Sequence, residues 1–281
     1  MADAPLLTIV IANYNYGRFL EEAICSVLSQ LGEKSEGVRA GDVELIVVDG
    51  GSTDNSVEVI KKYENRIAWW VSETDGGQSN AFNKGFGHAN GKYLTWLNAD
   101  DVLVPGALVA IVGCIRKHPA CEWFTGNAYR FTEDRKVCEV CWGPHVYPSW
   151  LQRRHSPVVV FGPSSVFARD LWLRVGKIDE DIHLMMDTDL WIRFMIMGVK
   201  QRRINHFIWA FRMHADSKTA EYGDHKLSDA RRKQFADEIA RSNAKTGYKS
   251  SSFMHGLILI WRLLDGSLVK RAFLKRRMVS I

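Results

Sequence analysis

The chain has 281 residues, of which 46% are apolar and 25% charged, a composition typical of a folded globular protein. A chain of this length buries a sizeable core without disulfides or structural metals. No apolar run is long enough to span a bilayer, and the first residues lack the basic region and cleavage site of a signal peptide, so they indicate a strand. Five cysteines, an odd number, indicate reduced thiols in a cytoplasmic protein.

The net charge of +5 is unevenly distributed along the chain. From Lys245 to the end there are eight Lys and Arg against one acidic residue, a charge of +7, which leaves −2 for the rest. A near-neutral body argues against a nucleic-acid partner and for a local partner of the basic tail.

Apolar runs alternate with helical patterns along the first hundred residues. The runs predicted as strands are 6–12, 43–48, 67–72 and 93–97, and helical patterns fall at 19–31, up to about Tyr63, and at about 79–88. Strands that are apolar throughout and alternate with helices indicate a parallel sheet covered on both faces.

Ligands bind beyond the carboxyl ends of the strands in such sheets. Polar residues follow every predicted strand: Asn13-Tyr14-Asn15, Asp49, Glu73 with Asp75, and Asn98-Ala99-Asp100-Asp101. No GxGxxG follows the first strand, which argues against a dinucleotide-binding protein.

The second half of the chain has a mixed pattern. We expect a hairpin over 122–142, an apolar run at 157–168, helices at about 169–175 and 186–197, a strand at 204–213, and helical structure from about Asp224 to the end. Cys138 and Cys141 form a CxxC, but no second pair or histidines follow at zinc-ligand spacing.

The segment Asn98 to Asp101 predicts a metal site. Hard divalent cations prefer oxygen ligands, and one or two carboxylates plus substrate phosphates are a common ligand set. The alternative is that Asp100 or Asp101 caps a helix that starts near Pro105. Acidic residues at the neighbouring strand ends, Asp49 and Asp75, favour the metal site.

Six motifs in order resemble glycosyltransferase family 2, whose members have the nucleotide-sugar-binding GT-A fold. They are TIVIANYNYGRFLEEAICSVLSQ, ELIVVDGGSTDNSVEVI, SETDGGQSNAFNKGF, GKYLTWLNADD, MMDTDLWIRF and FRMHADSKT. The resemblance covers about residues 6–219. It implies an α/β protein with a GT-A-type, mostly parallel sheet flanked by helices, and an inverting transfer of sugar from a nucleotide sugar.

The resemblance also implies a nucleotide site. Asn13 and Tyr14 match the loop that cradles the base, and Tyr14 can stack on the base face. Asp49 matches a base- or ribose-binding acid, and Asp75 matches another nucleotide contact. Lys84 lies near enough in sequence to reach a phosphate. The alternatives are a packed turn aromatic for Tyr14 and an ordinary surface lysine for Lys84.

The family's metal-binding Asp-x-Asp is matched by Asn98-Ala99-Asp100, with a neutral amide in place of the first acid. We therefore expect Asp100 to carry most of the metal contact and Asp101 to contact the ribose or the transferred sugar. His214 matches a residue that joins the metal shell, which suits Mn²⁺ better than Mg²⁺. Arg212 or Lys218 can supply positive charge to the diphosphate.

Asp187 matches the family's general base, which deprotonates the acceptor hydroxyl. A position at a helix start would stabilise its ionised form. The alternative is that Asp187 caps this helix. Asp189 is expected to pair with Arg193 one turn later, and Trp191 to belong to the core.

The tail has an apolar stretch, 257–264, followed by five basic residues. Leu257, Trp261, Leu264 and Leu268 share one helical stripe, as in an interfacial helix on an anionic leaflet. The alternatives are a helix packed on the catalytic body or a dimer contact.

The sequence therefore predicts a catalytic domain at 1–220 and a basic amphipathic helical extension at 221–281. The catalytic domain divides into a nucleotide-sugar half at about 1–105 and an acceptor half at about 106–220. The predicted activity uses a UDP-sugar donor, a divalent metal and a glycan or lipid-linked acceptor, in the cytoplasm or peripherally at the inner face of the plasma membrane. Alternatives are a non-catalytic nucleotide-sugar- or glycan-binding module and a sugar-phosphate nucleotidyltransferase.

Overall fold

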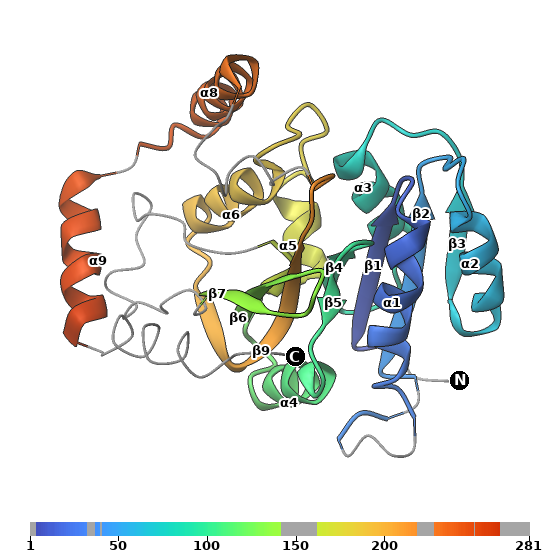
Figure 1. Ribbon diagram of the computed structural model, residues 1–281. Coiled ribbons are helices and arrows are strands. Elements are labelled where there is room, and N and C mark those ends of the chain that lie inside the picture. The colour runs from blue at the N-terminus through green and yellow to red at the C-terminus, as the bar shows by residue number, and fades with distance from the viewer. Residues whose placement is uncertain are drawn as a thin grey trace.

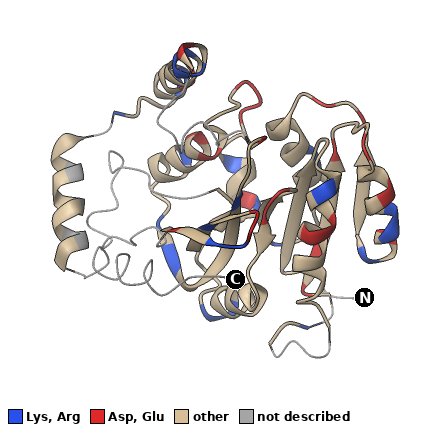
Figure 2. Ribbon diagram, viewed as in Figure 1, with Lys and Arg blue, Asp and Glu red and all other residues tan. Residues whose placement is uncertain are grey.

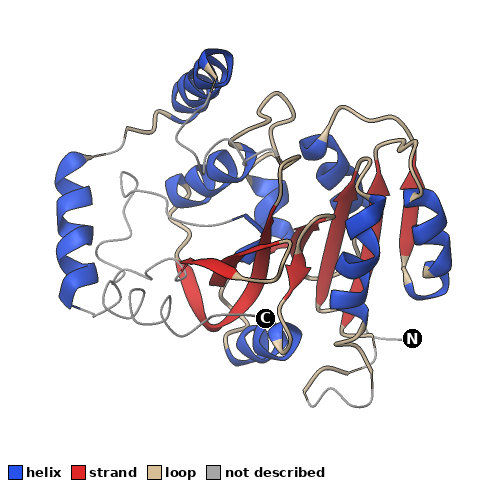
Figure 3. Cartoon of the chain, viewed as in Figure 1, coloured by secondary structure: helices blue, strands red, loops and turns tan. Residues whose placement is uncertain are grey.

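The computed structural model describes residues 4–32, 37–39, 41–141, 162–217, 228–249 and 251–264. Expectations for residues 157–161, Lys218, Leu268 and the basic cluster after it lie outside the described residues. Within the described part, strands run through the middle of the molecule and helices lie on both sides of them (Figures 1 and 3).

The strands are β1 Leu7–Asn13, β2 Val43–Asp49, β3 Trp69–Ser72, β4 Tyr93–Asn98, β5 Val102–Leu103, β6 Trp123–Thr132, β7 Val137–Cys141, β8 Ser165–Ala168 and β9 Gln201–Met213. The α-helices are α1 Gly17–Leu28, α2 Ser56–Lys62, α3 Gln78–His88, α4 Ala107–Lys117, α5 Arg169–Arg174, α6 Met186–Ile196, α8 Asp229–Thr246 and α9 Ser252–Leu264. Short 3₁₀ turns lie at Glu64–Arg66 and Gly162–Ser164.

One sheet carries the described strands in the order β3-β2-β1-β4-β8-β6-β9-β5, with β7 paired to β6. Strands β1 to β4 are parallel, as the alternating pattern predicts. Their register pairs Asn13 with Asp49 and Ala12 with Asn98, so the polar strand ends meet at one edge of the sheet.

The sheet becomes mixed beyond β4. Strand β8 is antiparallel to both β4 and β6, whereas β9 runs parallel to β6. The hairpin expected over 122–142 is confirmed as β6 and β7. This half of the sheet places β6 and β9 opposite the ends of β1 and β4, where they can form a second wall of a site.

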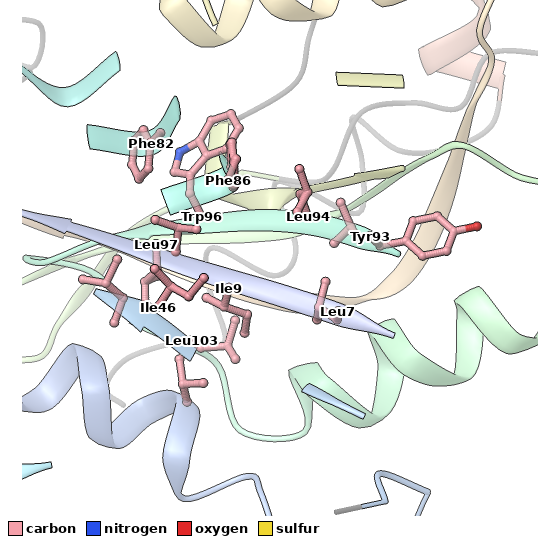
Figure 4. Packing of buried hydrophobic residues seen from close by; sticks show 14 of the residues in the cluster. Leu7, Ile9, Ile46, Phe82, Phe86, Tyr93, Leu94, Trp96, Leu97 and Leu103 are labelled. Atoms are coloured by element: carbon pink, nitrogen blue, oxygen red, sulfur yellow. The ribbon is translucent and has the colours of Figure 1, made fainter. Parts of the chain in front are cut away.

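The core lies on both faces of the parallel strands. On one face, Trp96 packs with Phe82 and Phe86 of α3 (Figure 4). Trp96 also stacks on Trp191 of α6, with ring centroids 5.5 Å apart, so Trp191 is a core residue as predicted. Gly85 allows α3 to approach closely, because a Cβ there would lie 2.4 Å from the Val10 side chain. Helices α1 and α4 cover the opposite face (Figure 1).

The C-terminal region forms two helices where one helical stretch was predicted. Helix α8 ends at Gly247, which adopts a left-handed conformation with φ of 61° that favours glycine. Phe235 and Ile239 of α8 pack against the main core, so α8 is not a separate extension.

Helix α9 differs from α8 because most of its described apolar side chains face solvent. Phe253, Leu259, Ile260, Leu263 and Leu264 are each more than half exposed. Leu257, which belongs to the predicted stripe, is half-buried. Among the described residues, no helix has the length and hydrophobicity needed to cross a membrane.

Candidate functional site

A cavity of about 830 Å³ lies where β1, β2 and β4 end. Binding sites for small ligands are commonly about 300–1,000 Å³ in volume. Its walls come from the loops after β1 and β3, from β6 and β9, and from the first turn of α6. Figure 2 shows acidic residues in the loops at this edge of the sheet. The predicted site residues that line the cavity are Asn13, Tyr14, Asp75, Asn98, Asp100 and Asp187.

The loop after β1 presents an aromatic ring and an amide to the cavity. Tyr14 is 61% exposed, so the alternative of a packed turn aromatic does not describe it. Asn15 takes the left-handed conformation with φ of 56°, which asparagine tolerates. Its backbone N–H donates to Ser52 Oγ at 2.8 Å, and its Oδ1 accepts from the Thr53 N–H at 2.9 Å. These bonds fix the loop to the loop after β2.

Asn13 is buried at the cavity floor and has an unused acceptor. Its Nδ2 donates to Asp49 Oδ1 at 2.6 Å and to Ser52 Oγ at 3.2 Å. Its Oδ1 has no hydrogen-bond partner among the described residues. A buried carbonyl oxygen beside a cavity is a ready acceptor for a ligand N–H.

Asp49 does not line the cavity, and the nucleotide contact expected of it stays a prediction. The residue is fully buried, and its carboxylate accepts from Asn13 Nδ2, the Ser52 N–H and hydroxyl, and the Ser72 hydroxyl. Because protein donors occupy both oxygens, Asp49 acts by orienting Asn13.

The loop after β3 brings Asp75 but not Lys84 to the cavity. Asp75 Oδ1 accepts from the Gly77 N–H at 2.7 Å, and its carboxylate lines the cavity. Lys84 lies outside the cavity lining and pairs with Glu73 at 2.8 Å, and the phosphate contact expected of Lys84 stays a prediction.

The amide of Asn98 bridges two neighbours, Asp101 and Gln78, and its expected role as a weak metal ligand stays a prediction. Its Nδ2 donates to Asp101 Oδ2 at 2.8 Å, and its Oδ1 accepts from Gln78 Nε2 at 2.8 Å. An amide can donate to the carboxylate, which an aspartate in this position cannot do when ionised.

Asp101 is fully buried and is not part of the cavity lining, and the ribose or sugar contact expected of it stays a prediction. Burial, reinforced by the nearby charge of Asp100, raises the pKa of Asp101 well above its usual value. The backbone N–H of Arg212 donates to Asp101 Oδ1 at 2.9 Å, and this hydrogen bond lowers the pKa of Asp101, which partly offsets the effect of burial.

Asp100 faces the cavity and lies beside His214. Asp100 Oδ2 is 3.1 Å from His214 Nε2. His214 is buried against the rings of Tyr16 and Phe19, and its Nδ1 has no partner among the described residues. The helix that follows is capped at Gly106, so neither Asp100 nor Asp101 caps it.

This pair is a partial fit to a divalent metal. Within the described residues, no group of three or more His, Cys, Asp and Glu side chains forms a metal cluster. Asp100 offers a hard oxygen at the cavity, and the buried imidazole of His214 lies directly behind it, outside the cavity lining. Substrate phosphates commonly complete the shell of a metal held by one or two protein ligands.

Arg212 does not reach the cavity. Its guanidinium is buried between the rings of Phe19 and Phe131, with Nη2 donating to Glu22 Oε2 at 2.6 Å and Nε donating to the Asp100 carbonyl at 2.8 Å. Arg212 therefore fixes the backbone that carries Asp100, and a diphosphate contact by Arg212 or Lys218 stays a prediction.

Asp187 is the second residue of α6 and faces the cavity. The N-cap of the helix is Met185, so the capping alternative for Asp187 is not what the structure shows. Its Oδ1 accepts from the Thr188 N–H at 2.6 Å. Burial raises the pKa of Asp187, and the Thr188 bonds partly offset this effect. Asp189 points away and pairs with Arg193 at 2.8 Å, as predicted.

The cavity lining also includes residues to which the sequence analysis gave no role, among them Tyr16, Gln78, Arg130 and Asp216. Burial, with the charge of Asp100, raises the pKa of Tyr16 to about 12, so its hydroxyl stays protonated and donates to the Asp216 carbonyl at 2.9 Å. Gln78 follows the Gly76-Gly77 pair, a signal that could have indicated it. Asp216 lies within the motif FRMHADSKT, whose predicted roles fell on its neighbours, whereas no local pattern marks Arg130.

The matching family model is "Glycosyl transferase family 2", over residues 8–156. The chain belongs to this family. An uncharacterized glycosyltransferase of Mycobacterium tuberculosis is 30% identical over 199 residues, covering 69% of this chain and 70% of the relative. One of Nostoc is 39% identical over 109 residues, covering 38% of this chain.

The chain spans only part of several curated relatives. It covers 31% of the Nostoc protein and 59% of an uncharacterized glycosyltransferase of Rickettsia prowazekii, to which it is 27% identical over 68% of this chain.

Solved structures share the fold. A mannosyltransferase of Pyrobaculum calidifontis, in complex with GDP-Man and Mn²⁺, superposes with a TM-score of 0.57 at 15% identity, covering 94% of this chain and 81% of that chain. Staphylococcus aureus TarS in complex with UDP-GlcNAc gives a TM-score of 0.54 at 15% identity, covering 76% and 60%. The predicted GT-A-type α/β fold is thereby confirmed.

Proposed function

We propose that the chain is an inverting glycosyltransferase that moves one sugar from a nucleoside diphosphate to a hydroxyl group of a glycan or lipid-linked acceptor. The observation that supports this most is that the Asp187 carboxylate faces the same cavity as Asn13, Tyr14 and Asp100. A donor held at the strand ends would thus have a carboxylate within the same enclosure.

The donor we propose is a UDP-sugar. The Tyr14 ring is exposed for stacking on a base, and the unpaired Oδ1 of Asn13 suits the N–H of a pyrimidine. Asp75 can accept a hydrogen bond from a ribose hydroxyl. Solved structures of the same fold hold UDP-GlcNAc or GDP-Man, which supports a nucleotide sugar as donor.

Asp100 and His214 would hold a divalent metal, and Mn²⁺ suits the imidazole better than Mg²⁺. When bound, such an ion stabilises the negative charge that builds on the departing diphosphate. Arg212 keeps the Asp100 backbone in place, and Asn98 holds Asp101 and Gln78 beside it.

Asp187 would act as the general base. Its ionised carboxylate takes the proton of the acceptor hydroxyl while the oxygen forms a bond to C1 of the sugar. The bond from C1 to the diphosphate oxygen breaks, and the diphosphate leaves with the electron pair. Attack from the side opposite the leaving group inverts the configuration at C1. Burial raises the pKa of Asp187 towards a value better suited to a base.

The division of the chain remains part of this proposal. Residues 1–105 would bind the nucleotide sugar, 106–220 would bind the acceptor, and the C-terminal region would serve another purpose. Helix α8 joins the catalytic unit, whereas α9 presents its apolar side chains to solvent. Figure 2 shows no acidic residue on the described part of α9.

We propose that α9 and the basic residues after it bind an anionic membrane surface. Apolar residues would enter the interface, and each Lys or Arg near the surface would contribute about 1 kcal/mol. The location would be cytoplasmic and peripheral, at the inner face of the plasma membrane, where a lipid-linked acceptor is concentrated.

A thermal-shift screen across nucleotides and nucleotide sugars, with and without Mn²⁺, tests the donor assignment. A ligand that binds only the native state at about 100 times its Kd stabilises the protein by about 2.7 kcal/mol. A UDP-sugar should raise the melting temperature more with Mn²⁺ than without. If no nucleotide sugar shifts the melting temperature, the proposed donor is wrong.

A further inference from the structure

Helix α8 holds the segment that carries Asp187. Glu238 of α8 is only 6% exposed, and its Oε2 accepts from the backbone N–H groups of Leu184 at 2.8 Å and Met185 at 3.2 Å. Its other oxygen accepts from Gln234 Nε2 at 3.0 Å. The carboxylate therefore contacts the chain immediately before α6 begins.

Helix α6 has no side-chain cap of its own at Met185. The first N–H groups of a helix have no partner within it, and the helix dipole makes this end positive. Glu238 places a buried negative charge at this end from a different helix. Because protein donors use both of its oxygens, the carboxylate is held in one orientation.

A second bond joins the two helices on the other side of Asp187. The Ser242 hydroxyl, 1% exposed, donates to Asp189 Oδ1 at 2.6 Å. The other oxygen of Asp189 pairs with Arg193. Met185 and Asp189 each lie two residues from Asp187, so α8 fixes the first turn of α6 at two points that flank Asp187.

Helix α3 holds the same segment from another side. The Ser79 hydroxyl donates to the Ile182 carbonyl at 2.9 Å, and Asn83 Nδ2 donates to the Ile178 carbonyl at 2.9 Å. The segment between these contacts and Asp187 contributes His183, Leu184 and Met186 to the cavity lining. Helices α3 and α8 thus clamp one wall of the cavity.

We infer that Glu238 and Ser242 are positioning residues, which orient Asp187 through the first turn of α6. This inference rests on the proposed function, because it gives Asp187 the role of base. It extends that function into the C-terminal region, where no motif of the sequence indicated a link to catalysis. Small misplacements of a catalytic group cost as much as about 100-fold in rate.

The test uses the full chain with Glu238→Ala and Glu238→Gln. Glu238→Ala should lower kcat by about 10- to 100-fold, with donor KM little changed, because Glu238 contacts the segment before α6 rather than the loop that carries Asn13 and Tyr14. Glu238→Gln keeps the shape and one acceptor oxygen, so it should recover part of kcat. Asp237→Asn, an exposed change of charge on the same helix, is the matched control and should leave both parameters unchanged.

Ser242→Ala provides an independent variant if Glu238→Ala does not fold. It removes one hydroxyl and should also lower kcat more than it changes donor KM. If folded Ser242→Ala and Glu238→Gln both keep the full kcat, the inference is wrong.

The double variant Glu238→Ala with Asp187→Asn separates the inference from the proposed function. If Glu238 acts through Asp187, removing it should not lower the residual rate of Asp187→Asn further. A full additional loss would show that Glu238 acts independently and would overturn the inference. A normal rate for Asp187→Asn alone would instead overturn the proposed role of Asp187.

Discussion

Replacing Asn98 with Asp tests how the cavity edge is organised. The Asn98 amide donates to the buried Asp101 at 2.8 Å, and Asn98→Asp would turn this bond into a contact between two carboxylates. Asp101 already has a raised pKa because of burial and the charge of Asp100. A third carboxylate next to these two should therefore destabilise the protein when no metal is bound.

The loss in the free energy of unfolding can be estimated from the distance between the two carboxylates. Two unit charges about 4 Å apart interact with about 4 kcal/mol at an effective dielectric constant of about 20. Proton uptake by the pair relieves part of this energy, so we expect a net loss of roughly 2–4 kcal/mol, including the lost hydrogen bond. For a chain of this size, each kcal/mol lowers Tm by about 2–4 °C.

The loss should depend on pH and on metal. A carboxyl group whose pKa is raised in the folded state stabilises the protein at low pH. This stabilisation is lost as the pH rises through the raised pKa. The Tm difference between Asn98→Asp and the wild type should therefore grow as the pH rises through the raised pKa of Asp101. Mn²⁺ with a nucleotide should reduce this Tm difference, because the new carboxylate adds a hard ligand for the metal.

Thermal melts of Asn98→Asp and the wild type at a series of increasing pH values, with and without Mn²⁺, provide the assay. Asn80→Asp is the matched control, since Asn80 Nδ2 donates to Glu180 at 2.8 Å at an exposed position. Solvent screening should keep its effect below about 1 kcal/mol. If Asn98→Asp melts like the wild type at the highest pH without metal, the bridging role of Asn98 is refuted.

Three further predictions follow from the same structure. Asp187→Asn should raise Tm at neutral pH, because it removes a buried charge, and the gain in Tm should vanish as the pH falls through the raised pKa of Asp187. Thermal melts that show no gain in Tm at neutral pH would contradict this prediction. Asp100→Ala should weaken Mn²⁺-dependent donor binding, measured by titration, far more than Asn98→Ala, and a chelator should stop sugar transfer. If transfer continues in excess EDTA, the proposed metal requirement is wrong. Removing residues 256–281 should abolish co-sedimentation with anionic vesicles and leave transfer to a short acceptor intact, whereas insoluble truncated protein would place α9 in a core or dimer contact.

The parallel half of the fold could be predicted because its signals are local. Each apolar run and the helical pattern after it lie within about 30 residues, and the ranges 6–12 and 43–48 match β1 and β2 to within one residue at each end. The helix break at Gly247 was missed, since a single glycine in a helical pattern is a weak signal.

The site was predicted in part. Strand ends indicated Asn13, Asp75 and Asp100, which line the cavity, and equally Asp49, which does not. Sequence position does not reveal whether other parts of the chain occupy a side chain, as the donors around Asp49 do. The burial of Arg212 between two rings and the contact of Glu238 with Leu184 depend on segments far apart in sequence, so no local pattern could indicate them.

The most direct test of the account is the turnover of Asp187→Asn with a donor that the thermal-shift screen identifies. Asp134→Asn makes the same chemical change at an exposed turn and serves as the control. We expect Asp187→Asn to bind the donor normally and to lose about 100-fold or more in transfer, as is typical when a general base is removed, while Asp134→Asn transfers at the wild-type rate. A wild-type rate for Asp187→Asn would contradict the proposed mechanism.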